Sequence, residues 1–320
     1  MHAHRLVLRP QTAFGSPLAG DMLFGQFCWG VRWAFGEARL DELLETYSEG
    51  HPFAVFSDAF PHGFVPLPTV PSFLRSDAQD ADRKDWKSKR WFSVEHAGKS
   101  VDFWWENAVD DEEAYSQGAQ AVAEQPYKPR FAMQPHNSIS RLSGTTGTGA
   151  FAPYTQSRLW HHPDTQLDLY VLLDENRLSL ADFMQVLSSI GKDGYGRDAS
   201  IGLGKFELEK SGSQPLSVGG SARSFMTLAS CAPQGLGYDS TSSYYQIKTH
   251  FGRHGDMAAL SDPFKRPVLL ARTGAVFTLT DERKTLFLGQ GIRNTSKAHA
   301  SAVHQGYAPA VPVSGLRRSS

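Results

Sequence analysis

Residues 167–210 read LDLYVLLDENRLSLADFMQVLSSIGKDGYGRDASIGLGKFELEK and contain the clearest order of elements in the chain. The apolar run 167–173 is typical of a buried strand. Residues 178–190 predict a helix opening at Ser179, because apolar side chains recur on one side at helical spacing. A glycine-rich loop at 191–204 then leads into a second strand at 205–210. The stretch therefore predicts a strand, a helix and a strand in succession.

The first 60 residues predict the same order. Alternation at His4–Arg9 indicates a strand closed by Pro10, and Asp21 can cap a following helix. That helix has an apolar face made of Leu23, Phe24, Phe27, Cys28 and Val31. A short helix at Glu37–Tyr47 and a strand at residues 53–56 follow. Without an insertion at about 60–155, the order is β-α-β-β-α-β, which is the ferredoxin-like order that RNA-recognition domains also use.

The insertion has an irregular pattern. Its first half holds a mixed-charge run at 77–90, an acidic run at 110–113 and the tryptophans at 86, 91, 104 and 105. It is too aromatic for a disordered linker, so we expect it to fold with its own hairpins.

The last third predicts a sheet-rich module. Strand patterns occur at 223–231, 243–249, 267–279, 285–288 and 303–313, and one helix is plausible around Ala258. We expect a domain boundary near residue 215, with domains at 1–215 and 216–320.

Composition excludes several classes of protein. The chain has 320 residues, is 40% apolar and 12% aromatic, and has no apolar run long enough to span a membrane. Its start lacks a signal-peptide pattern, and two cysteines cannot form a disulfide framework or a zinc site by themselves. We therefore expect a soluble cytoplasmic protein with a sizeable core.

Charge is distributed unevenly along the chain. Residues 1–125 carry 11 Lys/Arg against 19 Asp/Glu, a formal charge of −8, whereas residues 126–320 carry 21 against 14, a charge of +7. The later part can therefore hold a local basic footprint for nucleic acid, although ordinary surface variation also accounts for such a difference.

The glycine-rich loop is the strongest candidate binding segment. Residues 194–199 formally match a dinucleotide fingerprint, but that motif requires a strand before it and a helix after it, and the order here is reversed. The loop also does not match the Walker A motif of nucleotide-binding proteins. Glycines let backbone N–H groups approach phosphates, and the loop supplies three cations. The candidate residues are Gly191, Lys192, Gly194, Gly196, Arg197, Gly202, Gly204 and Lys205. The alternative is a long flexible connection without a ligand.

A second candidate is HNSISR at 136–141, followed by GTTGTG at 144–149. His136, Asn137 and Arg141 suit phosphate or sugar contacts, but the segment could equally be a surface hairpin.

The histidines do not predict a metal site or a cofactor. His161 and His162 are adjacent, so on a strand they point to opposite faces. His250 and His254 flank Gly252 in a poor helix, and neither H-E-x-x-H nor C-x-x-C occurs. A histidine acting as general base in metal-free RNA cleavage stays open as an alternative.

Several motifs in order resemble one family. FGS at 14–16 with DMLFG at 21–25, and IGLGKF at 201–206, resemble the RAMP superfamily of CRISPR proteins. FSDAFP at 56–61, HNSISR at 136–141 and HQGYAP at 304–309 narrow the resemblance to the fourth subunit of Csm (type III-A) effector complexes.

The resemblance implies an α+β fold of two ferredoxin-like domains, with a β-hairpin thumb in the insertion. It implies a non-catalytic subunit, not a homo-oligomer, that binds the 5′ tag of crRNA and joins the large polymerase-nuclease subunit to a RAMP backbone subunit. Contact with target RNA would be indirect. Gln305, Gly306 and Tyr307 would line the path of the tag. Two rivals remain: a RAMP endoribonuclease using His136 or His162, and a protein–protein adaptor whose loop never touches RNA.

Overall fold

The computed structural model describes residues 1–71, 74, 83–119, 126–209, 214–215, 220–253, 264–297, 299 and 301–316. The helices are α1 Gly20–Phe35, α2 Glu37–Leu44, α3 Arg83–Ser88, α4 Val101–Glu106, α5 Asp111–Gln117 and α6 Leu180–Asp193, with short 3-10 turns η1 Tyr47–Glu49, η3 Val94–His96, η4 Gly149–Phe151 and η5 Ala199–Ile201. The strands of the first half are β1 His2–Pro10, β2 Ala54–Pro61, β3 Phe64–Pro66, β4 Trp91–Ser93, β5 Arg130–His136, β6 Tyr154–Trp160, β7 Leu167–Leu173, β8 Phe206–Leu208 and β9 Gln214–Pro215. Those of the second half are β10 Gly220–Thr227, β11 Ile247–His250, β12 Val268–Ala271, β13 Val276–Thr285, β14 Phe287–Ile292 and β15 His304–Pro312.

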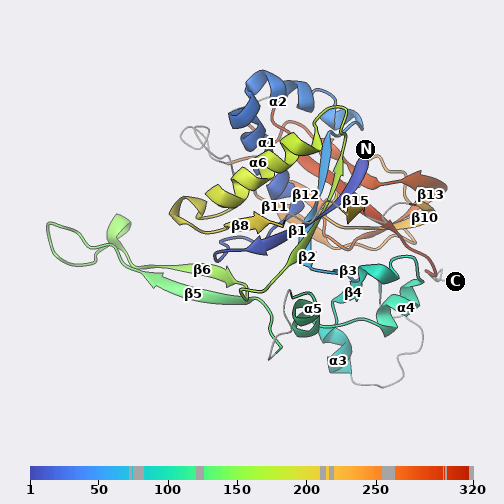
Figure 1. The fold of residues 1–320 in the computed structure, drawn as a ribbon, viewed down its shortest axis with the longest axis horizontal. Helices are drawn as coiled ribbons and strands as arrows, with labels where there is room; N and C mark the ends of the chain where they lie inside the picture. Colours follow the sequence, from blue (N-terminus) through green and yellow to red (C-terminus); the bar gives the residue numbers. More distant parts are fainter. Residues whose placement is uncertain are drawn as a thin grey trace.

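The first sheet has the predicted ferredoxin-like order. Its strands run β2-β7-β1-β8, all antiparallel, with β9 also paired to β1. Helices α1 and α6 pack on one side of it (Figure 1). Strand β7 is buried along its whole length, since Val171 lies in the helix-covered core and Tyr170 lies in a second core on the other side.

Two helix starts can be compared with the sequence. Ser179 caps α6 by accepting a hydrogen bond from the backbone N–H of Asp182. The predicted cap at Asp21 is wrong, because α1 begins one residue earlier, after Ala19. A Cβ at Gly20 would lie 2.5 Å from the carbonyl oxygen of Phe56, so only glycine fits here. Asp21 is inside the first turn and buried.

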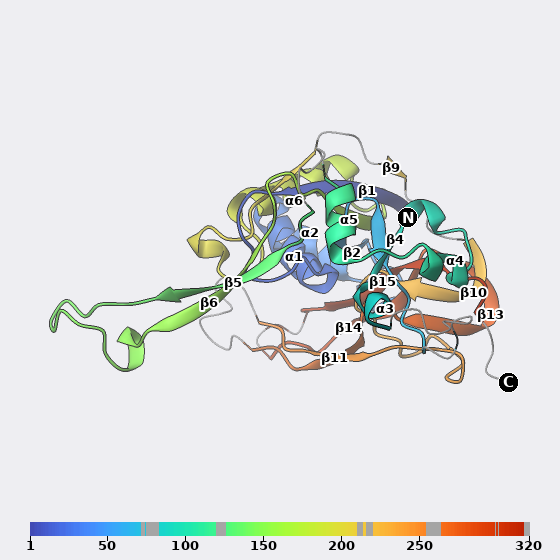
Figure 2. The ribbon, with the colours of Figure 1, turned by 90° about the horizontal axis from the view of Figure 1, so that it is seen from below.

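The insertion has two parts. The first, from β3 to α5, packs onto the body through its tryptophans: the rings of Phe92 and Trp104 stack at 4.4 Å, and Trp86 stacks on Trp105. The second part is the hairpin β5–β6, which projects far from the body (Figures 1 and 2). This hairpin is the only feature within the described insertion residues that matches the predicted thumb.

The second half forms another sheet, in the order β13-β10-β15-β14, with β11 and β12 paired separately. This order differs from that of the first sheet, and no helix occurs within the described parts of 220–316. The helix expected around Ala258 falls outside the described residues. A single residue separates β13, which ends at Thr285, from β14, which begins at Phe287. The strand predicted at 285–288 therefore covers the junction between two strands.

The two halves share a core. The Gln305 amide on β15 donates to the carbonyl oxygen of Phe56 on β2 and accepts from the N–H of the same residue, at 2.8 and 2.9 Å. The Tyr307 hydroxyl donates to the carbonyl oxygen of Tyr47 at 2.6 Å. The domain boundary near residue 215 stays a prediction. No helix within the described ranges combines the length and the apolar character needed to span a membrane.

Candidate nucleic-acid interface

The glycine-rich loop is held to the segment before α1 by a set of hydrogen bonds. The Tyr195 ring is buried, and its hydroxyl donates to the carbonyl oxygen of Pro17 while accepting from the N–H of Ala19. The Gln26 side chain on α1 donates to the carbonyl of Gly194 and accepts from the N–H of Gly196. The loop is therefore a fixed part of the body, which argues against the flexible-connection alternative.

The glycines of this loop divide into two groups. Gly191, Gly194 and Gly204 are buried, and a Cβ at any of them would collide with the carbonyl oxygen of another backbone segment. These three glycines permit backbone-to-backbone packing, which gives them a structural role, and their approach to phosphate stays a prediction. Gly202 has φ of +92° with no atom within 4 Å of a built Cβ, and Gly196 meets only Ser16. Only these two leave room for a ligand.

One loop cation, Arg197, contacts the hairpin directly. The Arg197 guanidinium, 54% exposed, donates to the carbonyl oxygen of Ser157 on β6 at 2.7 Å. Phe14, just before α1, forms an isolated antiparallel bridge with Leu159 on β6. Lys192 is exposed and Lys205 is half-buried. The structure thus brings the glycine-rich loop and the hairpin together, which the sequence does not indicate.

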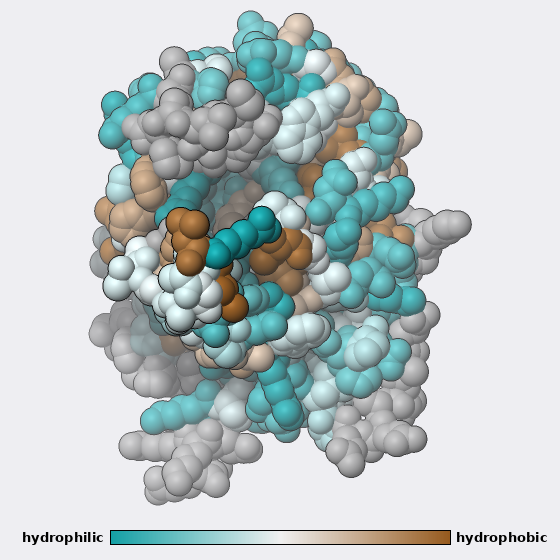
Figure 3. All heavy atoms as spheres, turned by 90° about the vertical axis from the view of Figure 1, so that its left-hand side faces the viewer, coloured by the Kyte–Doolittle hydropathy of each residue, from teal (hydrophilic) through white to brown (hydrophobic). Residues whose placement is uncertain are grey.

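The hairpin has two unlike faces. Residues opposite each other on antiparallel strands share a face, and the faces alternate along each strand. The first face, here called the basic face, comprises Arg130, Ala132, Gln134, His136, Tyr154, Gln156, Arg158 and Trp160. The other, the apolar face, comprises Phe131, Met133, Pro135, Thr155, Ser157 and Leu159. Figure 3 looks at the hairpin from its tip, where hydrophilic and hydrophobic side chains lie next to one another.

Aromatic rings and cations alternate on the basic face. The His136 and Tyr154 rings stack at 5.2 Å with planes 13° apart, and an Arg158 Nη lies 3.3 Å from His136 Nε2. Tyr154 is 50% and Trp160 49% exposed, so both rings offer a free surface for a base. Arg158, Tyr154 and Trp160 were not among the residues expected from the sequence, although alternation at 130–136 and 154–160 could have indicated them.

The segment HNSISR begins at the far end of β5. Asn137 and Arg141 are exposed near the tip, where the N–H of Gly144 donates to the carbonyl of Ser140. The candidates from this segment and from the loop therefore lie along an extended strip of loop plus hairpin and not around one pocket. A strip suits an extended polymer better than a compact small molecule.

The third predicted segment does not belong to this strip. Gln305 and Tyr307 are fully buried, and their polar atoms bond to the backbone of Phe56, Tyr47 and Gly50. A Cβ at Gly306 would lie 2.5 Å from the carbonyl oxygen of Gln290. Gln305, Gly306 and Tyr307 are therefore core residues, and the expectation that they line the path of an RNA is wrong.

The histidines named for catalysis are far apart. His136 ends β5 opposite Tyr154, whereas His162 follows the other end of β6, six strand residues or roughly 20 Å away. His162 stacks on Tyr127. His161 is half-buried beside Phe14, and desolvation of its ring lowers its pKa to about 4. His136 and His162 therefore cannot act together on one phosphate.

No protein-family model matches the chain, and no curated protein sequence does. Solved structures match its fold along nearly its whole length. A chain of the crystal structure of a Csm3-Csm4 subcomplex in the type III-A CRISPR-Cas interference complex is 14% identical, with a TM-score of 0.58 over 98% of this chain and 100% of that chain. A chain of the Csm1-Csm4 cassette in complex with AMPPNP is 13% identical, with a TM-score of 0.57 over 99% and 100%. A chain of the same cassette with one ATP is 14% identical, with a TM-score of 0.55 over 99% and 100%.

The matched structures have Csm4 in common, and their chains align with this one from end to end. The chain therefore has an α+β fold like that of the chains matched in these Csm4-containing structures, in agreement with the α+β fold expected from the sequence.

Proposed function

We propose that this chain is a Csm4-type subunit of a type III-A CRISPR effector complex and that it binds crRNA without catalysing a reaction. The observation that carries the proposal is the full-length likeness of its fold to chains solved with Csm1 and with Csm3. On this proposal the partners are a large subunit of the Csm1 kind and a backbone subunit of the Csm3 kind, in a complex that works in the cytoplasm.

The strip of glycine-rich loop and hairpin is the proposed RNA-binding surface. It offers six cations over an extended surface, which suits a single strand better than a mononucleotide. They are Arg130, Arg141, Arg158, Lys192, Arg197 and Lys205. In this arrangement the 5′ tag of the crRNA lies against the loop, and the hairpin bends the strand where the tag ends. On this proposal the chain contacts target RNA only indirectly, through the crRNA.

The absence of a reaction is part of the same proposal. The rival is an endoribonuclease with His136 or His162 as general base; the two lie too far apart to act on one phosphate together, so cleavage would depend on one of them alone. Incubating the chain with repeat RNA in EDTA separates this view from an endoribonuclease. Cleavage that His136→Ala abolishes would overturn the proposal.

Ultraviolet crosslinking of the assembled complex tests RNA contact directly. Crosslinks from the tag should map to peptides that contain residues 130–160 and 191–205. Crosslinks confined to the other subunits would leave only an adaptor role. Lys205→Ala should also weaken binding of the tag in a salt-dependent way, and the matched control is Arg283→Ala on β13, an exposed cation on a different part of the body.

A further inference from the structure

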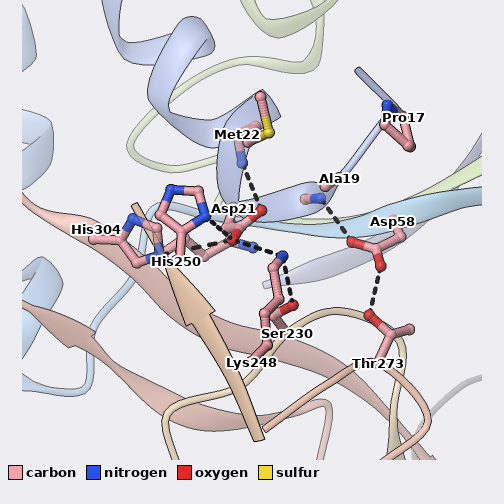
Figure 4. Close-up of polar contacts among 12 residues, drawn as sticks. Pro17, Ala19, Asp21, Met22, Asp58, Ser230, Lys248, His250, Thr273 and His304 are labelled. Carbon is pink, nitrogen blue, oxygen red and sulfur yellow. Dashed lines mark hydrogen bonds and ion pairs between the residues drawn. The ribbon is translucent and has the colours of Figure 1, made fainter. Parts of the chain in front are cut away.

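Three side chains from distant parts of the sequence meet where the two halves pack together. Asp21 lies in the first turn of α1, His250 ends β11, and His304 begins β15. Each offers one ligand atom, and the three atoms all lie within 4.8 Å of one another. Figure 4 shows both imidazole rings directed at the Asp21 carboxylate.

The distances between the three ligand atoms are close to those of a metal site. Asp21 Oδ2 lies 3.3 Å from His250 Nδ1 and 3.8 Å from His304 Nε2. Ligand atoms about 2.1 Å from one tetrahedral zinc ion lie roughly 3.4 Å apart, so small side-chain movements would complete the geometry. Two imidazoles and one carboxylate form a donor set that first-row transition metals accept.

His304 supplies an independent indication of a ligand. Its side chain is only 6% exposed, yet its Nε2 has no hydrogen-bond partner and points at the Asp21 carboxylate. A buried polar atom without a partner is costly, and natural structures usually satisfy it.

One feature opposes a metal ion at this place. The Lys248 ammonium lies 3.4 Å from Asp21 Oδ2 and 3.3 Å from Ser230 Oγ, so it neutralises the carboxylate in this structure. Lys265 adds a second positive charge to the surroundings of His304. The Lys248 side chain is 32% exposed on a flexible stem, so it can turn to solvent when a divalent cation replaces it.

We propose that Asp21, His250 and His304 bind a divalent transition-metal cation, with zinc as the best fit, in competition with Lys248. The ion would link α1, β11 and β15 and so clamp the two sheets together. Its role would be structural, because the ligands lie in the packed junction between the two halves. The proposal does not depend on the proposed function.

The first test uses the tag-free, full-length chain after dialysis against EDTA. Zn²⁺ titration should show one equivalent bound, and one equivalent of Co²⁺ should give visible absorption typical of nitrogen and oxygen ligands. At a hundredfold excess of free Zn²⁺ over Kd, the midpoint of thermal unfolding should rise by about 5 °C. Absence of a saturable, one-equivalent site for both ions would overturn the proposal.

Variants locate the site. Asp21→Asn and His304→Gln should each lower zinc affinity by about 100-fold or more, since each removes a direct ligand. Lys248→Met should raise affinity, because it removes the competing charge. The matched control His51→Gln changes an exposed histidine and should bind as the wild type does. If the ligand variants do not fold, Lys248→Met decides: unchanged or weaker binding in that variant would contradict the site.

Discussion

The strongest quantitative prediction concerns the salt dependence of RNA binding. The strip of loop and hairpin carries six cations, and each phosphate contact with a single strand contributes about 0.7 to the slope of log affinity against log salt concentration. If all six engage phosphates, the slope is about −4 for the wild-type chain. Replacing Arg130 and Arg158 by glutamine should reduce it to about −2.8.

These slopes translate into a measurable difference. Between 50 and 200 mM salt, the wild-type chain should lose affinity about 300-fold and the double variant about 50-fold. Fluorescence anisotropy with a labelled single-stranded RNA that carries the repeat-derived tag measures both. Arg283→Gln is the control, because Arg283 is exposed on β13, away from the hairpin (Figure 1). Equal slopes for the double variant and the control would refute the assignment of the hairpin as a phosphate-binding surface.

Three further predictions concern single side chains. Tyr154→Ala or Trp160→Ala should weaken RNA binding by about 1–3 kcal/mol with little change in salt slope, because stacking carries no charge; an altered slope would argue against stacking. Trp104→Ala should lower the free energy of unfolding by about 3–5 kcal/mol in urea titrations, because Trp104 is fully buried against Phe92; a loss under 1 kcal/mol would contradict its place in the core. Desolvation lowers the pKa of His161 from 6.5 in the unfolded chain to about 4 in the folded chain, so the unfolded chain takes up the proton first as the pH falls. The free energy of unfolding should therefore fall by about 2 kcal/mol from pH 7 to pH 5 on this account. His161→Phe should flatten the plot of unfolding free energy against pH by that amount, and an unchanged plot would show that His161 does not cause the loss.

Local patterns predicted the first sheet well. The apolar run at 167–173 is buried along its length, and the helix after it begins at Ser179 as expected. Both signals are local: the strand follows from its apolar run, and the helix start follows from the Ser179 cap, which accepts a hydrogen bond from the N–H of Asp182. The ferredoxin-like order of the first sheet follows from these elements, since antiparallel neighbours and right-handed crossovers leave few arrangements.

Features that depend on distant residues were not predictable. The segment HQGYAP looks polar, yet Gln305 is buried because the backbone of Phe56 satisfies its amide. The tryptophans at 91–105 had no visible partner in the sequence, because they pack in a core that combines the insertion with residues of both sheets. The meeting of Asp21 with His250 and His304 has no local spacing, so no metal motif could reveal it.

The candidate interface was predicted in part. The sequence identified Arg197 and the hairpin segment at 136–141, but it could not show that Arg197 bonds to the hairpin at Ser157. The sequence also assigned the loop glycines to a ligand, whereas three of them serve to pack against neighbouring backbone. Glycine patterns report close approach without saying what approaches.

The most direct test of the proposed function is to co-express a tagged copy of the chain with its genomic neighbours and to analyse the purified assembly by native mass spectrometry and RNA sequencing. The account predicts a large subunit, several copies of a backbone subunit and a short RNA with a uniform 5′ tag. A monomer without RNA, recovered while the neighbours assemble on their own, would contradict it.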